Sequence, residues 1–144
     1  MIMPDANILI YAHNEASDAH ERAHRWLEEK LQSSEIICFS WQTITAFLRI
    51  MTNSKLFSNP LNLRQAFEIV EQWLARANAI VVEPTANFMT IFQRAAADGQ
   101  TTGALLMDAH LAALAIEHGA TLATNDRDFV RFSKLKTENP LQDK

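Results

Sequence analysis

The amino-acid sequence predicts an α/β fold in which a central, mainly parallel sheet is covered by helices on both faces. Short apolar runs typical of buried strands alternate with longer segments whose apolar residues recur at helical spacing. This alternation is typical of βαβ units, which form parallel sheets. A chain of 144 residues suits one hydrophobic core, so residues 1–144 are expected to form a single domain.

The expected elements follow from where the apolar runs begin and end. Ser17 and Asp18 are N-cap candidates for a helix that continues to about Gln32, and Asn59-Pro60 marks a turn. The runs expected as strands are residues 1–4, 36–39, 79–82 and 121–124. The segments expected as helices are residues 7–12, 17–32, 44–51, 63–74, 88–95 and 104–119.

Composition narrows the function classes. The net charge of −4 argues against a chain-wide electrostatic preference for nucleic acid, although Arg127, Arg131, Lys134 and Lys136 form a local basic cluster that is either a solvated face or a phosphate contact. The one cysteine, Cys38, excludes an internal disulfide and is expected in the core. No apolar stretch reaches transmembrane length and no signal peptide is apparent, so a cytoplasmic protein without a membrane partner is expected.

Asp108 is the most unusual residue of the chain. It interrupts the segment 104–119, which is apolar on nearly every side, and an aspartate in such a helix needs a partner or a cation. Asp126 and Asp128 follow the last expected strand, and Asp5 follows the first. The carboxyl ends of parallel strands meet at one edge of a sheet, so these aspartates are expected to converge.

Several carboxylates without a cysteine or an evident histidine ligand favour Mg²⁺ or Mn²⁺ over zinc. Such sites commonly serve phosphoryl chemistry. Each residue also has a simpler interpretation: Asp5 could cap the helix 7–12, Asp126 and Asp128 could cap the segment that enters Phe129, and Asn7 is expected in a turn with a supporting role.

A second motif, His20-Glu21-Arg22-Ala23-His24, matches the H-E-x-x-H signature of zinc proteases. Leu27 and Lys30 stand where the extended signature has glycine and a third histidine. The apolar stripe of this helix leaves both histidines at its border, so a surface helix is the favoured interpretation.

Several segments resemble a known family. Met3–His13 resembles the opening of a PIN domain, in which the aspartate after the first strand is a metal ligand. Segments 41–53, 108–115 and 124–129 resemble the VapC toxins of bacterial toxin–antitoxin pairs, and Asn139-Pro140-Leu141 fits one VapC subgroup. The resemblance implies a three-layer α/β/α fold and Mg²⁺- or Mn²⁺-dependent endoribonuclease activity on tRNA or rRNA. It also implies a VapB-type antitoxin and a homodimer.

The resemblance also suggests residue roles. Asp5, Asp108 and Asp126 match the family's metal-site acids, Asp128 matches a further acid, and Thr124 matches a supporting hydroxyl. Arg49, Arg127 and Arg131 are candidate phosphate contacts.

Many PIN domains carry a glutamate where this chain has Ala46, which predicts an active enzyme with weaker metal affinity. This departure also leaves open a different class of function. A PIN fold with a degraded site could bind RNA or an antitoxin without cutting.

Overall fold

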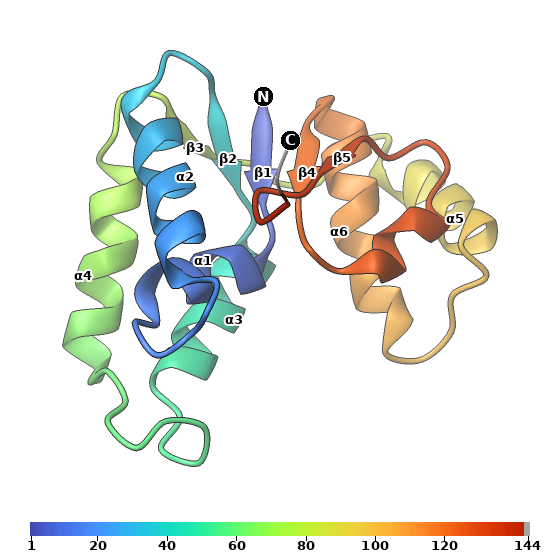
Figure 1. Cartoon of the computed structure of the whole chain (residues 1–144). Helices are drawn as coiled ribbons and strands as arrows, with labels where there is room; N and C mark the ends of the chain where they lie inside the picture. Colours follow the sequence, from blue (N-terminus) through green and yellow to red (C-terminus); the bar gives the residue numbers. More distant parts are fainter. Residues whose placement is uncertain (143–144) are drawn as a thin grey trace.

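A five-stranded sheet organises the chain, with the strand order β3-β2-β1-β4-β5 and every neighbouring pair parallel (Figure 1). The computed structural model describes residues 1–142. The strands are β1 (Ile2–Pro4), β2 (Ile37–Phe39), β3 (Ala79–Val81), β4 (Thr121–Ala123) and β5 (Thr137–Glu138). The mainly parallel sheet predicted from the sequence is therefore confirmed.

Helices cover both faces of this sheet and give three layers (Figure 1). The first face carries α1 (Ala6–His13), α2 (His20–Gln32), α3 (Trp41–Met51) and α4 (Leu63–Leu74). The second face carries α5 (Phe88–Asp98), α6 (Leu105–His118) and the short 3₁₀ helix η1 (Arg127–Arg131).

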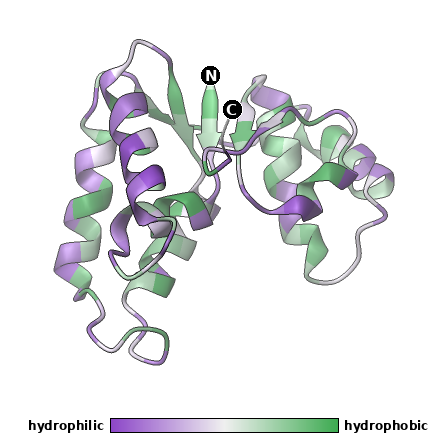
Figure 2. Ribbon diagram, in the orientation of Figure 1, coloured by the Kyte–Doolittle hydropathy of each residue, from purple (hydrophilic) through white to green (hydrophobic). Residues whose placement is uncertain are grey.

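Alternation along the strands builds one core on each face, because successive strand residues point to opposite sides. Ile37 and Phe39 of β2 pack with α1 to α4, whereas Cys38 between them packs with α5 and α6. Figure 2 shows the same division, with apolar strands between helices whose polar residues lie mainly outside. Cys38 is fully buried as expected, and burial raises the pKa of its thiol to about 11.

Local capping sets the helix starts and explains two differences from the expected boundaries. The Ser40 hydroxyl accepts the Thr43 N–H at 3.0 Å, so α3 begins at Trp41, before the expected residue 44. Ser17 accepts the Ala19 N–H at 3.1 Å within a turn, so α2 begins only at His20. Gly119, with φ of 69°, ends α6 in the left-handed conformation that glycine adopts without strain.

Strand β5 was not predicted from the sequence. Its two residues are exposed and lack an apolar pattern, and β5 exists because Glu138 pairs with Ala123 of β4. Such an edge strand is defined by its neighbour and not by its own composition.

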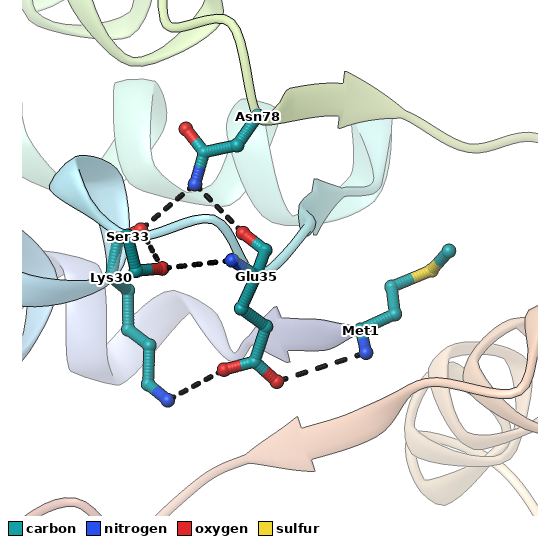
Figure 3. A network of polar contacts seen from close by, with 5 residues as sticks. All are labelled: Met1, Lys30, Ser33, Glu35 and Asn78. Carbon is teal, nitrogen blue, oxygen red and sulfur yellow. Dashed lines mark hydrogen bonds and ion pairs between the residues drawn. The ribbon is translucent and has the colours of Figure 1, made fainter.

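Polar contacts join the amino ends of the strands (Figure 3). The Asn78 amide donates to the carbonyls of Lys30 at 2.9 Å and Glu35 at 2.7 Å. Glu35 also pairs with the Lys30 ammonium at 2.7 Å and lies 3.7 Å from the Met1 amine. These contacts tie together the segments that enter β1, β2 and β3, at the edge opposite the candidate site.

Candidate metal centre

The carboxyl ends of β1 and β4 bring the first candidate acid into place. Asp5 caps α1, and its Oδ1 accepts the Ala6 N–H at 2.7 Å. Its Oδ2 accepts the hydroxyl hydrogen of buried Thr124 at 2.8 Å, and the Thr124 oxygen in turn accepts the Asp126 N–H at 3.0 Å. Thr124 thus connects the acids at the two strand ends.

Three further carboxylates meet beside this pair of strand ends. Asp108, Asp126 and Asp128 each offer one oxygen, and these oxygens all lie within 4.8 Å of one another. Asp108 lies in the first turn of α6, while Asp126 caps η1 and accepts the Asp128 N–H at 2.9 Å. Asp108 and Asp126 are half-buried, and Asp128 is exposed.

The three acids that lie closest together in the structure are not the three that the sequence suggested as metal ligands. The tight trio (Asp108, Asp126 and Asp128) includes Asp128, whereas Asp5 stands next to it with both oxygens engaged by hydrogen bonds. Asp5 therefore caps α1 as one interpretation expected, and its role as a metal ligand stays a prediction. Asn7, expected in a turn, instead lies exposed in the first turn of α1.

Burial and mutual repulsion make the ionised site costly. Desolvation raises the pKa of Asp5, with a smaller contribution from the charge of Asp126. Desolvation also raises the pKa of Asp108, and the charges of Asp126, Asp5 and Asp128 add to the shift. Carboxylates in this situation are stabilised by protons or by a cation.

The donor set fits a hard divalent cation. All the oxygens that converge are carboxylate oxygens, which suit Mg²⁺ and Mn²⁺, and no imidazole or thiolate belongs to the trio. Asp5 and Asp108 are partly buried next to further negative charge, and a bound cation would offset both the burial and the repulsion.

The candidate phosphate contacts differ in their surroundings. Arg49 on α3 and Arg127 at the start of η1 are exposed. Arg131 is half-buried: its Nη1 donates to the Gly99 carbonyl at 2.9 Å and its Nε to the Asp128 carbonyl at 3.1 Å. Its Nη2 lies 4.0 Å from Oδ1 of Asp128.

Sequence reasoning missed one residue at this site. The Gln42 side chain donates to the carbonyl of Met107 at 3.1 Å and so holds α3 against the start of α6, beside Asp108. Ala46 follows one turn later on the same face of α3 and is half-buried. The sequence could have indicated Gln42, because it lies four residues before Ala46 and therefore on the same helix face.

Comparison with known proteins places the chain in a family. The model of the PIN domain matches residues 2–135. The chain belongs to the PIN domain family.

Curated relatives narrow the assignment. Ribonuclease VapC37 of Mycobacterium tuberculosis is 39% identical over 140 residues, covering 97% of each chain. VapC ribonuclease Mb2897 of Mycobacterium bovis is 32% identical over 141 residues, covering 98% of this chain and 96% of that protein. Within the PIN domain family, the protein is a member of the VapC group.

Solved structures agree with the fold. The VapBC2 structure from Rickettsia felis, bound to a promoter DNA fragment, matches with a TM-score of 0.70 and 23% identity, covering 96% of this chain and 98% of that one. VapBC-1 from nontypeable Haemophilus influenzae matches with a TM-score of 0.69 and 22% identity, covering 99% of this chain and all of that one. Among the described residues, no helix is long and apolar enough to cross a membrane.

Proposed function

We propose that the protein is a metal-dependent endoribonuclease, the toxin of a VapBC-type pair, which hydrolyses RNA phosphodiester bonds at its aspartate-lined Mg²⁺ or Mn²⁺ centre. The convergence of Asp108, Asp126 and Asp128 within 4.8 Å carries this proposal. Membership of the VapC group and the ribonuclease names of its relatives support it.

The residues are assigned separate tasks. Asp5, Asp108 and Asp126 hold the cation, and Thr124 keeps Asp5 in place through its 2.8 Å hydrogen bond. Asp128, the exposed member of the trio, orients the attacking water and accepts its proton. When bound, the divalent cation supplies Lewis-acid polarisation of the scissile phosphate and lowers the pKa of water.

Two exposed cations are assigned to the RNA contact. Arg127 and Arg49 are assigned to the phosphate backbone because both are exposed. Arg127 lies in η1 with Asp128, and Arg49 lies on α3, which contacts the start of α6 through Gln42. The substrate class is structured RNA such as tRNA or rRNA, and the protein acts in the cytoplasm as a homodimer.

A VapB-type antitoxin is the partner we expect. Purification of the untagged protein from its host should yield a small second protein, and its removal should release the nuclease activity. A chain isolated alone, with activity that the co-expressed neighbouring gene product does not alter, would contradict this partnership.

The decisive experiment measures RNA cleavage. Purified protein is incubated with total tRNA and rRNA in Mn²⁺, Mg²⁺ or EDTA, beside Asp108→Asn and the control Asp18→Asn, which changes an exposed aspartate outside the site. Discrete metal-dependent cuts are expected from the wild type and the control. Asp108→Asn should lose them while its melting temperature rises, because one repelling charge is removed.

Ala46 favours a second candidate function, a PIN-fold module that binds RNA or an antitoxin without cutting. That function predicts RNA binding that is insensitive to EDTA and unchanged in Asp108→Asn. A folded wild type that binds but never cleaves would replace the nuclease proposal with this one.

A further inference from the structure

The motif His20-Glu21-Arg22-Ala23-His24 is not used by the proposed function. It forms the first turns of α2, in the outer layer of the protein. Glu21 is exposed and pairs with Arg25 at 3.1 Å, so its carboxylate is committed to the helix surface and not to a buried catalytic position. This environment does not support a zinc protease.

The two histidines nevertheless lie close together on one face of α2. They are one helical turn apart, their ring centroids lie 5.5 Å from each other, and their planes are only 25° from parallel. Imidazoles at this spacing on one helix face can bind a single metal ion, as in the zinc-protease helix.

The orientation of His20 is fixed by a backbone contact. Its Nδ1 lies 2.9 Å from the carbonyl oxygen of Tyr11. A carbonyl only accepts, so Nδ1 carries the hydrogen and Nε2 retains its lone pair. A hydrogen bond from the second ring nitrogen to a carbonyl is the arrangement that orients metal-ligating histidines in proteins.

A third imidazole lies close to the pair. The Nε2 atom of His13, at the end of α1, is buried without a hydrogen-bond partner. His24 and His20 both act electrostatically on His13. Among the described residues, however, only the aspartate trio brings three ligand atoms together, so His13 does not act as a third ligand beside His20 and His24.

We propose that His20 and His24 bind a late first-row transition-metal dication, such as Zn²⁺, through their ring nitrogens. Water completes the coordination, and the hydrogen bond from His20 to the Tyr11 carbonyl keeps the first ligand in place against α1. Imidazole nitrogen prefers such ions, whereas the carboxylate centre prefers Mg²⁺ or Mn²⁺. The two centres are distinct because most of α1 separates Asp5 from Tyr11, a rise of about 9 Å at 1.5 Å per residue.

The test is a Zn²⁺ titration of the full-length protein without a polyhistidine tag. The protein is stripped with EDTA and returned to millimolar Mg²⁺, which keeps the carboxylate centre occupied by a hard cation. Binding is followed by calorimetry and by the melting temperature, for the wild type, His24→Gln, Asp108→Asn and the control His118→Gln. His24 is exposed, so its replacement leaves the fold intact.

Zn²⁺ should bind the wild type, Asp108→Asn and His118→Gln alike and raise their melting temperatures. His24→Gln should weaken binding by at least about tenfold, because the chelate is lost. No binding by the wild type, or equal binding by His24→Gln, would overturn the proposal. Loss of binding in Asp108→Asn would assign the zinc to the carboxylate centre instead. None of these readouts depends on ribonuclease activity, so this proposal can fail without affecting the proposed nuclease.

Discussion

His13 shows how strongly a single environment can alter one side chain. Its imidazole lies 5.6 Å from the rings of both Phe47 and Trp73, within the core between α1, α3 and α4. Burial, followed by the nearby His24 and His20, lowers the pKa of His13 from its ordinary 6.5 to about 4. The folded protein therefore keeps this ring neutral at pH values where the unfolded chain protonates it.

This difference predicts acid sensitivity. Between pH 6.5 and pH 4 the unfolded state binds the proton first, so stability present above pH 6.5 is lost as the pH falls, by on the order of 3 kcal/mol from this group. His13→Phe, which keeps a ring against Phe47 and Trp73, should flatten that part of the stability curve, measured by urea unfolding at several pH values. The control His118→Gln should keep the wild-type slope. An unchanged slope in His13→Phe would show that other groups cause the acid sensitivity.

At the scale of secondary-structure elements, the end of α5 packs closely against η1 and the residues that follow it. A Cβ on Gly99, at the end of α5, would lie 2.6 Å from Cε1 of Phe132 and 3.1 Å from Cδ of Arg131. Asp98 accepts the Ser133 N–H at 2.7 Å, and Arg131 bonds the Gly99 carbonyl. The end of α5 thus holds the segment that carries Asp128 in the aspartate trio.

Gly99→Ala should therefore disturb the metal centre from a distance. We expect a loss of stability of about 1–3 kcal/mol from overpacking, together with a higher Mn²⁺ concentration for half-maximal RNA cleavage. The control Gly119→Ala introduces comparable strain at φ of 69° but meets no atom within 4 Å, and lies at the far end of α6. It should lose stability without changing the Mn²⁺ requirement. The same requirement in both variants would show that α5 does not position Asp128.

Helix α3 offers the converse test at Ala46, because this half-buried position shares a helix face with Gln42. Ala46→Glu should add a carboxylate to the centre and lower the Mn²⁺ concentration needed for cleavage. Thr45→Glu, an exposed neighbour on the same helix, supplies the same charge on another face and should have little effect. Identical metal dependence in Ala46→Glu and the wild type would disprove the idea that the missing glutamate weakens metal binding.

At the scale of the whole molecule, the amino ends and the carboxyl ends of the strands differ in the polar groups that they carry. The amino ends are joined by the contacts of Asn78, Lys30 and Glu35 (Figure 3), whereas the carboxyl ends hold repelling aspartates. The stabilising polar contacts and the candidate metal centre therefore lie at opposite ends of the strands. Changes at one edge should leave the other largely intact.

Asn78→Ala tests this separation. Losing two hydrogen bonds to the Lys30 and Glu35 carbonyls should cost about 1–3 kcal/mol in urea unfolding, with no change in the Mn²⁺ dependence of cleavage. Asn87→Ala is the control, because Asn87 begins α5 without a side-chain capping bond and should change neither quantity. A shift in the Mn²⁺ requirement of Asn78→Ala would show that the two edges are coupled.

Much of this arrangement was predictable from the sequence. Apolar runs separated by polar turn residues predict the strands β1 to β4 and the covering helices. The side chains that a strand or a helix buries must be apolar and recur at the spacing of that element. Asp108 is recognisable in the sequence as a candidate site residue, because a carboxylate rarely occupies an apolar helix unless something compensates its charge. The same reasoning predicted that Asp5 and Asp126, at strand ends, would face one edge of the sheet.

Only the tertiary structure decided how these parts meet. Pairing with β4 creates β5, the Thr124 hydroxyl joins Asp5 to the Asp126 backbone, and the contact of α5 with η1 gives Arg131 its protein partners. The trio forms because the packing of η1 against α6 brings Asp126 and Asp128 to Asp108, about twenty residues earlier in the chain. These outcomes depend on distances between residues far apart in the chain, which local propensity and periodicity do not encode.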